Sequence, residues 1–345
     1  MSSDELPVPP FTIDPSVKDR LDPEYVEFFE KNLAPEGGKN LLFTHLVPLD
    51  VVRAGGNVMP GQSPLLEVGS TKDISIPREL YKGPAVPVRV FTPKGEPPAG
   101  GWPCTIWFHG GGWVLGGIDT ENSFCTHVCE WSKSVVVSVD YRMAPENPFP
   151  AAIEDSYEAL IWILKNAASL GINATKVAVA GSSAGGNISA ILTHKYANDS
   201  AHQDLPSLVY QLLVVPVCDN TADKDTHLSW KEFEHTPQLP RGKMLWYRDL
   251  YLPNKADWKK PEASPIFYPA ESFKKVPPAF VACGECDVLR TEGEQYAEKL
   301  KQAGIETNLT VYPGMPHPVM AMDDCLTQGK RLVKETTDAL RNAFY

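Results

Sequence analysis

The 345-residue chain lacks long apolar runs, and none reaches the roughly 18 consecutive apolar residues that a membrane-spanning helix needs. Its N-terminus has neither a basic start nor an apolar segment, so we expect no secretory signal. Basic residues are also in deficit, because 32 Lys and Arg face 43 Asp and Glu, for a net charge of −11. An acidic surface argues against nucleic acid and anionic membrane as partners. We therefore expect a cytoplasmic protein that binds neither.

The sequence also lacks internal repeats, low-complexity segments and a regular cysteine framework. Seven cysteines are an odd number without framework spacing, which favours reduced thiols over disulfides. Cys283 and Cys286 form a Cys-Gly-Glu-Cys pair, but a thioredoxin-like redox site would place such a pair at a helix start in a small βαβ domain. We keep redox function only as a minor alternative, and we predict no metal site.

The amino-acid composition is that of an ordinary globular protein. Apolar residues make up 43% of the chain and charged residues 22%, and the length suffices for one large α/β domain with insertions or for two smaller domains. The 32 prolines are about twice the usual frequency and lie mostly in connections. Their distribution predicts long ordered loops rather than a disordered region.

From residue 66 onward, apolar strand patterns alternate with helical patterns. This alternation predicts an α/β fold with a mostly parallel eight-stranded sheet, helices on both faces and an antiparallel first pair of strands. Thr291 and Glu294 have the spacing of a capping box at the start of a helix. The strands are expected at 66–76, 86–91, 104–108, 134–139, 176–180, 208–217, 278–283 and 307–312.

The most informative stretch is 177–187, where a buried strand runs into Gly-Ser-Ser-Ala-Gly and then into a helix. Strand, G-x-S-x-G and helix together indicate a nucleophile elbow, in which a sharp turn holds a serine above the sheet. The residues two before and two after that serine must be nearly free of side chains. Glycines meet this need around Ser183, whereas alanines flank Ser182, so Ser183 is the preferred nucleophile. The alternative is a glycine-rich turn without catalytic function.

A serine nucleophile needs a base and a group that orients the base. Such groups lie beyond the carboxyl ends of strands in an open α/β sheet. His317, held between prolines after the last predicted strand, is the best-placed base. The preceding strand leads to two acids, Glu285 and Asp287, of which we prefer Asp287, and Asp219 is a weaker rival. The order serine, aspartate, histidine is that of the hydrolase elbow.

Attack on a carbonyl also requires backbone N–H groups that stabilise the developing oxyanion, at about 3 kcal/mol per donor. The N–H of Ala184, next to the nucleophile, supplies one donor. A His-Gly-Gly-Gly stretch follows the strand that ends at residue 108, and we expect Gly110 and Gly111 to supply the others. His109 would brace this loop rather than act as a base.

With these motifs, the sequence resembles the hormone-sensitive-lipase-like branch of the α/β-hydrolases, which contains carboxylesterases and arylacetamide deacetylases. The resemblance implies an α/β-hydrolase core at 61–217 and 278–345, with a cap built from 1–60 and 218–277. It also implies ester hydrolysis through an acyl-enzyme without a cofactor. Many members carry Asp where this chain has Ser182. The matching motifs are His109-Gly-Gly-Gly-Trp113, Asp140-Tyr-Arg-Met-Ala-Pro-Glu-Asn-Pro-Phe-Pro-Ala151, Gly181-Ser-Ser-Ala-Gly-Gly-Asn187, Asp287-Val-Leu-Arg-Thr-Glu-Gly293 and His317.

The resemblance leads us to expect a serine carboxylesterase for small to medium esters, with Trp113, Trp246 and Tyr247 as substrate-pocket walls. A fungal cytosolic enzyme that removes acetyl groups from a secondary metabolite would fit. Two alternatives remain: a non-catalytic small-molecule receptor of the same fold, and a hydrolase of lactones or amides with the same triad. Many relatives dimerise, so a homodimer is a further expectation.

Overall fold

The computed structural model describes residues 7–54 and 59–345. The predicted absence of a signal at residues 1–6 and part of the predicted cap segment 1–60 therefore lie outside the described residues. The strands are β1 (Ser70–Ile76), β2 (Val86–Thr92), β3 (Trp102–Phe108), β4 (Val135–Val139), β5 (Ile172–Ser182), β6 (Tyr210–Val214), β7 (Ala279–Gly284) and β8 (Thr307–Tyr312). The helices are α1 (Pro15–Lys18), α2 (Pro23–Asn32), α3 (Lys39–Leu42), α4 (Leu49–Ala54), α5 (Asn122–Ser132), α6 (Ala151–Lys165), α7 (Ala184–Ala197), α8 (Leu228–Glu232), α9 (Arg241–Tyr251), α10 (Ala270–Phe273), α11 (Arg290–Gln302) and α12 (Thr327–Phe344).

The eight strands form one sheet in the order β1-β2-β4-β3-β5-β6-β7-β8. The pairs β1–β2 and β2–β4 are antiparallel, and every other neighbouring pair is parallel. The carboxyl ends of β3, β5, β7 and β8 consequently meet at one edge of the sheet, which is where an open α/β sheet places its ligand site. The predicted fold, including the antiparallel start, is confirmed.

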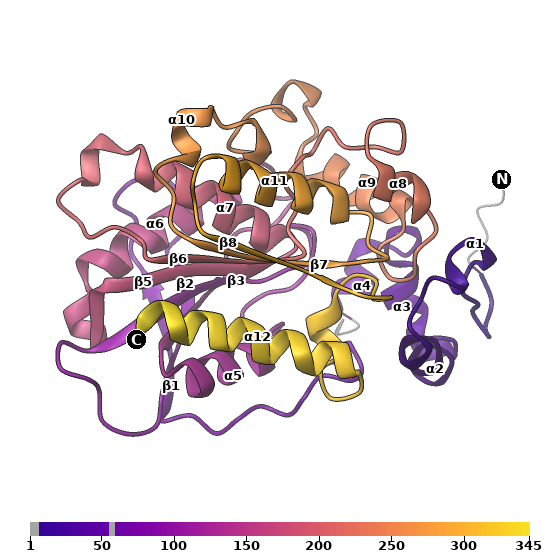
Figure 1. Cartoon of the computed structure of the whole chain (residues 1–345), viewed down its shortest axis with the longest axis horizontal. Helices are drawn as coiled ribbons and strands as arrows, with labels where there is room; N and C mark the ends of the chain where they lie inside the picture. Colours follow the sequence, from indigo (N-terminus) through magenta and orange to yellow (C-terminus); the bar gives the residue numbers. More distant parts are fainter. Residues whose placement is uncertain (1–6, 55–58) are drawn as a thin grey trace.

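Helices cover both faces of the sheet, with α5 and α12 on one face and α6, α7 and α11 on the other (Figure 1). Strands buried on both faces read as continuous apolar runs rather than as alternating patterns. The five residues of β4 are all buried, and so are the seven of β3. The sequence of these strands is therefore explained by the two helical layers.

Two helix starts differ from the sequence-based expectation. Thr291 is not an N-cap: α11 begins at Arg290, and its N-cap, Leu289, makes no side-chain capping bond. The Thr291 hydroxyl instead accepts a hydrogen bond from the Ser229 N–H at 3.1 Å. A tertiary contact has replaced the local capping bond. The closing helix α12 begins at Thr327, four residues later than expected from 323.

The N-terminal helices α1–α4 lie beside α8 and α9 at one end of the molecule (Figure 1). Hydrogen bonds join the two segments directly. Lys243 on α9 donates to the Leu41 carbonyl at 2.6 Å, and Gln238 donates to the Tyr25 hydroxyl at 3.1 Å. None of the helices in the described part of the chain combines the length and apolar character needed to cross a membrane.

Candidate active site

Ser183 occupies a sharp turn between β5 and α7. Its φ angle of 53° lies in the left-handed region, which costs free energy for a residue with a side chain. The Ser183 N–H is anchored to the Val214 carbonyl at 2.8 Å, so the turn is fixed to the neighbouring strand β6. This strained turn is the geometry expected of a nucleophile elbow.

The two glycines that flank Ser183 allow α7 to pass close to the sheet. A Cβ on Gly185 would lie 2.5 Å from the carbonyl carbon of Phe108 and 2.7 Å from the His109 carbonyl oxygen. A Cβ on Gly181 would lie 2.7 Å from the Phe108 carbonyl oxygen. It would also overlap the backbone of Gly185, so the obstacles at both positions are backbone atoms. Glycine is therefore needed at both positions if the elbow is to pack against the oxyanion loop, the glycine-rich segment 109–112 that follows β3.

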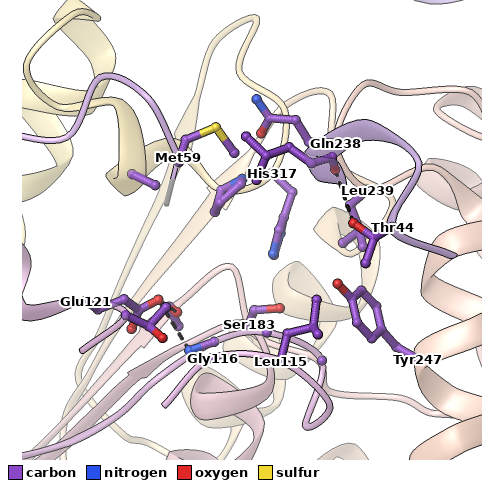
Figure 2. Close-up of a pocket in the computed structure, with 18 of the residues that line it drawn as sticks. Thr44, Met59, Leu115, Gly116, Glu121, Ser183, Gln238, Leu239, Tyr247 and His317 are labelled. Carbon is purple, nitrogen blue, oxygen red and sulfur yellow. Dashed lines mark hydrogen bonds between the residues drawn. The ribbon is translucent and has the colours of Figure 1, made fainter. Parts of the chain in front are cut away.

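His317 and Asp287 form a hydrogen-bonded pair at the ends of the last two strands. The His317 Nδ1–H donates to Asp287 Oδ2 at 2.8 Å, and Oδ1 of the same carboxylate accepts from the Leu289 N–H at 3.0 Å. Asp287 is 1% exposed and His317 is 6% exposed, which keeps water from competing for this bond. With Nδ1 engaged, Nε2 of His317 is left to accept a proton. Figure 2 shows Ser183 and His317 facing the same cavity.

The two rival acids have other partners. The Glu285 carboxylate accepts hydrogen bonds from the Gly314 N–H at 2.9 Å and from Arg20 at 3.2 Å. Asp219 accepts from the N–H and hydroxyl of Thr221. Of the three candidates, Asp287 is the carboxylate that accepts from His317. Ser182, the rival nucleophile, donates its hydroxyl to Glu121 at 2.6 Å.

The glycine loop after β3 presents its N–H groups differently from the expectation. The Gly110 N–H donates to a carboxylate oxygen of Glu121 at 3.3 Å, so this donor is engaged within the protein. Gly111 and Gly112 adopt φ angles of 107° and 62°. Across residues 7–54 and 59–345, the N–H groups of Gly111, Gly112 and Ala184 have no protein acceptor. These three donors, rather than that of Gly110, are free to bind an oxyanion.

His109 supports this loop from beneath. Its Nδ1–H donates to the Gly110 carbonyl at 2.7 Å, and its ring stacks on Tyr141 with centroids 4.3 Å apart. The Tyr141 hydroxyl donates to the His109 carbonyl at 2.7 Å. Burial lowers the pKa of His109 to about 4, so the ring is neutral near pH 7. The structure therefore agrees with a bracing role for His109.

Glu121 is a site residue that the sequence analysis missed. Its carboxylate links the oxyanion loop to the elbow, because it accepts from both Gly110 and Ser182, and it also accepts from Trp107 Nε1 at 2.8 Å. Burial raises the pKa of this carboxyl. A single glutamate before a helix carries no sequence signal for such a role, which depends on a contact with a residue 61 positions away.

The elbow, the oxyanion loop and His317 line one cavity of about 470 Å³. This volume lies within the range of small-molecule sites. In Figure 2, Met59 and Gln238 lie on the upper side of the cavity, while Leu115 and Tyr247 lie on the lower side near Ser183. Besides these residues, the lining includes Leu41, Thr44, Arg53, Ile118, Met143, Leu239, Lys243, Met244, Pro318 and Ala321.

Only one of the three predicted pocket walls lines the cavity. Tyr247 is that residue, and its ring lies so close to Gly112 that a Cβ there would overlap it. Trp113 is fully buried and stacks on Tyr251 with centroids 4.3 Å apart, so it is a packing residue. Trp246 packs on the ring of Tyr247 from outside the cavity lining. The interpretation of Trp113 and Trp246 as pocket walls was wrong.

The cysteines and potential metal ligands form no second chemical centre here. Cys283 and Cys286 are free and buried, and burial raises the pKa of both thiols, to about 12 for Cys286. A reactive redox thiol requires a lowered pKa. Within the residues that the structure describes, no group of three or more His, Cys, Asp or Glu side chains is arranged to hold a metal ion.

Known proteins are similar to this chain in both sequence and structure. Residues 105–321 match the family described as alpha/beta hydrolase fold. An AB hydrolase superfamily protein of Schizosaccharomyces pombe is 59% identical over 333 residues, which are 96% of each chain. The carboxylic ester hydrolase LipN of Mycobacterium tuberculosis is 37% identical over 270 residues, or 77% of this chain and 68% of its own. The crystal structure of a mutant of LAE6, an alpha/beta hydrolase enzyme from the Lake Arreo metagenome, superimposes with a TM-score of 0.84 at 31% identity and covers 95% of this chain and 99% of its own.

Proposed function

The chain belongs to the α/β-hydrolase family, and from this premise we propose that it is a serine carboxylesterase that hydrolyses small to medium esters. The observation that carries the proposal is the bond between His317 and Asp287, together with the position of His317 and Ser183 on one cavity. The similarity to the carboxylic ester hydrolase LipN supports an ester as the substrate.

In the proposed reaction, Ser183 attacks the ester carbonyl while its proton passes to Nε2 of His317. Asp287 holds the imidazole in the required tautomer and stabilises the imidazolium that forms. The carbonyl oxygen becomes an oxyanion, for which we propose the N–H groups of Gly111, Gly112 and Ala184 as donors. Gly110, an expected donor, is engaged with Glu121.

The tetrahedral intermediate collapses when His317 returns the proton to the leaving alcohol, and the acyl group remains on Ser183. A water molecule then attacks the acyl-enzyme, with His317 again as base, and releases the carboxylic acid. The same steps apply to lactones and amides, so the triad alone does not choose among these substrates. The size of the cavity favours compact acyl groups, and removal of acetyl groups from a secondary metabolite remains one prediction within this class.

The proposal is tested with p-nitrophenyl acetate, butyrate, octanoate and palmitate, by comparing wild type with Ser183→Ala. We expect the short esters to be hydrolysed and kcat to fall by about 10⁴-fold or more in the variant. Ser182→Ala is the matched control, since it removes the neighbouring hydroxyl and its bond to Glu121, and kcat should fall by no more than about tenfold. Full activity in Ser183→Ala would refute the mechanism.

A folded wild type that turns over no ester would favour the receptor interpretation. The engaged His317–Asp287 pair argues against it, because a receptor has no need of a base. Lactone and amide substrates should be assayed in parallel to cover the third alternative.

We also retain the division into a core at 61–217 and 278–345 and a cap at 1–60 and 218–277. Leu41 and Lys243 on the cavity wall support it, since each comes from one of the two cap segments. A homodimer and a cytoplasmic location remain predictions, to be checked by light scattering and by cell fractionation.

A further inference from the structure

The cavity wall contains a buried lysine that the proposed mechanism does not use. Lys243 lies on α9, is 6% exposed and lines the cavity. Its ammonium donates one hydrogen bond, to the Leu41 carbonyl at 2.6 Å. A charged lysine carries three N–H donors, so two of them remain without an acceptor among the residues that the structure describes. Burial lowers the pKa of Lys243 to about 7, which shows how unfavourable the isolated charge is at this place.

The other charged groups of the cavity are compensated within the protein. Arg53 pairs with Glu146 at 2.8 Å, and Asp119 pairs with Arg89. The Glu121 carboxylate accepts three hydrogen bonds. Considering residues 7–54 and 59–345, the lysine and arginine side chains that line the cavity are Arg53 and Lys243, and of these two Lys243 has no carboxylate within salt-bridge distance. A buried ammonium without a counter-ion costs free energy, so its place on a cavity wall suggests that a ligand supplies the counter-ion.

Helix α9 connects Lys243 to the loop that contains Gly112. Lys243 precedes Tyr247 by four residues, so both lie on one face of α9, about 6 Å apart along the helix axis. The Tyr247 ring packs directly on Gly112 of the oxyanion loop. A substrate group held by Lys243 would therefore be separated by only a few bonds from an ester carbonyl of the same substrate that binds at that loop. Leu41 and Met244 also line the cavity, and their apolar side chains suit a short methylene chain.

Resting on the proposed esterase function, we infer that Lys243 binds a carboxylate of the substrate, and that the preferred substrates are half-esters of short dicarboxylic acids. The free carboxylate accepts the two remaining N–H bonds of the ammonium, while the esterified end meets Ser183. Apolar lining between the two ends accommodates the connecting methylenes.

The test compares each half-ester with its neutral amide of the same shape. Monoethyl succinate, glutarate and adipate are paired with ethyl succinamate, glutaramate and adipamate, and ethanol release gives kcat/KM. A charge-assisted hydrogen bond corresponds to a preference of about tenfold or more. We expect wild type to prefer at least one half-ester by this factor. Lys243→Met should abolish the preference, because kcat/KM for the half-ester should fall by about tenfold or more beyond any change in kcat/KM for its amide.

Lys259→Met is the matched control, because Lys259 is an exposed lysine on the segment after α9 and its loss changes the net charge equally. This variant should keep the preference. Equal rates on both members of every pair in wild type would overturn the inference while leaving the esterase proposal intact, because the neutral esters would still be hydrolysed. A parallel loss on both members in Lys243→Met would overturn it too.

A second measurement needs no variant. Glutaramate and glutaramide are compared as inhibitors of p-nitrophenyl acetate hydrolysis by wild type. Glutaramate carries a free carboxylate, which glutaramide replaces by a neutral amide, so glutaramate should inhibit at a concentration about tenfold lower or more. Equal inhibition by both compounds would contradict the role of Lys243. Absence of turnover on every ester would instead refute the proposed function, and the inference with it.

Discussion

Replacement of Gly185 by alanine tests how closely the catalytic geometry depends on contact between α7 and β3. The added Cβ would lie 2.5 Å from the Phe108 carbonyl carbon and 2.7 Å from the His109 carbonyl oxygen. Its nearest neighbour would be the Phe108 carbonyl oxygen, with which it overlaps outright. Ordinary contact requires about 3.4 Å, so the carbonyl carbon alone demands a separation of roughly 0.9 Å between the two backbones, and the oxygen demands more. Overpacking of a buried site costs about 1–3 kcal/mol of stability. We expect a value at the upper end for this variant, because the obstacle is backbone and cannot move aside by changing a side-chain rotamer. The melting temperature should fall by about 6 °C or more.

The same separation moves the Ala184 and Ser183 backbone away from the oxyanion loop, which continues directly from Phe108. A misplacement of about 1 Å can cost a hundredfold in rate. We therefore expect kcat for p-nitrophenyl acetate to fall by about 10²-fold in Gly185→Ala, with a small change in KM. Thermal unfolding followed by circular dichroism and initial rates measured well below the transition separate the two effects.

Gly186→Ala is the matched control for this experiment. A Cβ on Gly186 would lie 3.0 Å from the Pro216 side chain and 3.3 Å from the Gly181 carbonyl oxygen, contacts that a shift of a few tenths of an ångström relieves. Because alanine also favours the helix, stability and kcat should change little. A Gly185→Ala protein as stable and as active as Gly186→Ala would refute the reasoning. A protein that is destabilised but keeps its full kcat would show that the elbow tolerates the displacement.

Three further predictions follow from single contacts. Asp287→Asn should lower kcat by about 10⁴-fold, whereas Glu285→Gln should change it less than tenfold; the reverse order in an ester assay would make Glu285 the acid. Glu121→Ala removes the link between Gly110 and Ser182, so we expect kcat to fall about tenfold at unchanged KM, and an effect on KM alone would contradict this. Burial, with a smaller contribution from the charge of Asp219, raises the pKa of Glu292 to about 8. Because the carboxyl ionises at a lower pH in the unfolded chain than in the folded protein, the protonated Glu292 stabilises the fold fully below about pH 4.5, and this stabilisation is lost as the pH rises to about 8. The free energy of unfolding in urea should therefore decline over this pH range in wild type and less steeply in Glu292→Gln. Parallel pH profiles of the two proteins would refute the raised pKa of Glu292.

The eight strands and the candidate triad were accessible from sequence because each depends on local order along the chain. A buried strand followed at once by Gly-x-Ser-x-Gly and a helix specifies the elbow without reference to any distant residue. Parallel strands then bring their carboxyl ends together, so Asp287 and His317 could be selected from their position after β7 and β8.

What the sequence analysis missed depends on contacts between distant segments. Glu121 acquires its role from Ser182, and Lys243 acquires its place from Leu41, 202 residues away. The expected roles of Trp113 and Gly110 were wrong for a related reason. Both residues lie in the loop that was expected to form the site. However, the Trp113 indole stacks on Tyr251 and the Gly110 N–H donates to Glu121, and the sequence around Trp113 and Gly110 does not indicate either partner.

One part of the cavity wall comes from stretches of the chain that are separate from the proposed triad. Leu41 and Thr44 lie in the first 54 residues, and Lys243 and Tyr247 lie between β6 and β7. Neither stretch contains a member of the proposed triad. The coding sequence thus separates recognition of the substrate from cleavage of the bond, so recombination among related genes can exchange the walls while every group that takes part in the reaction stays in place.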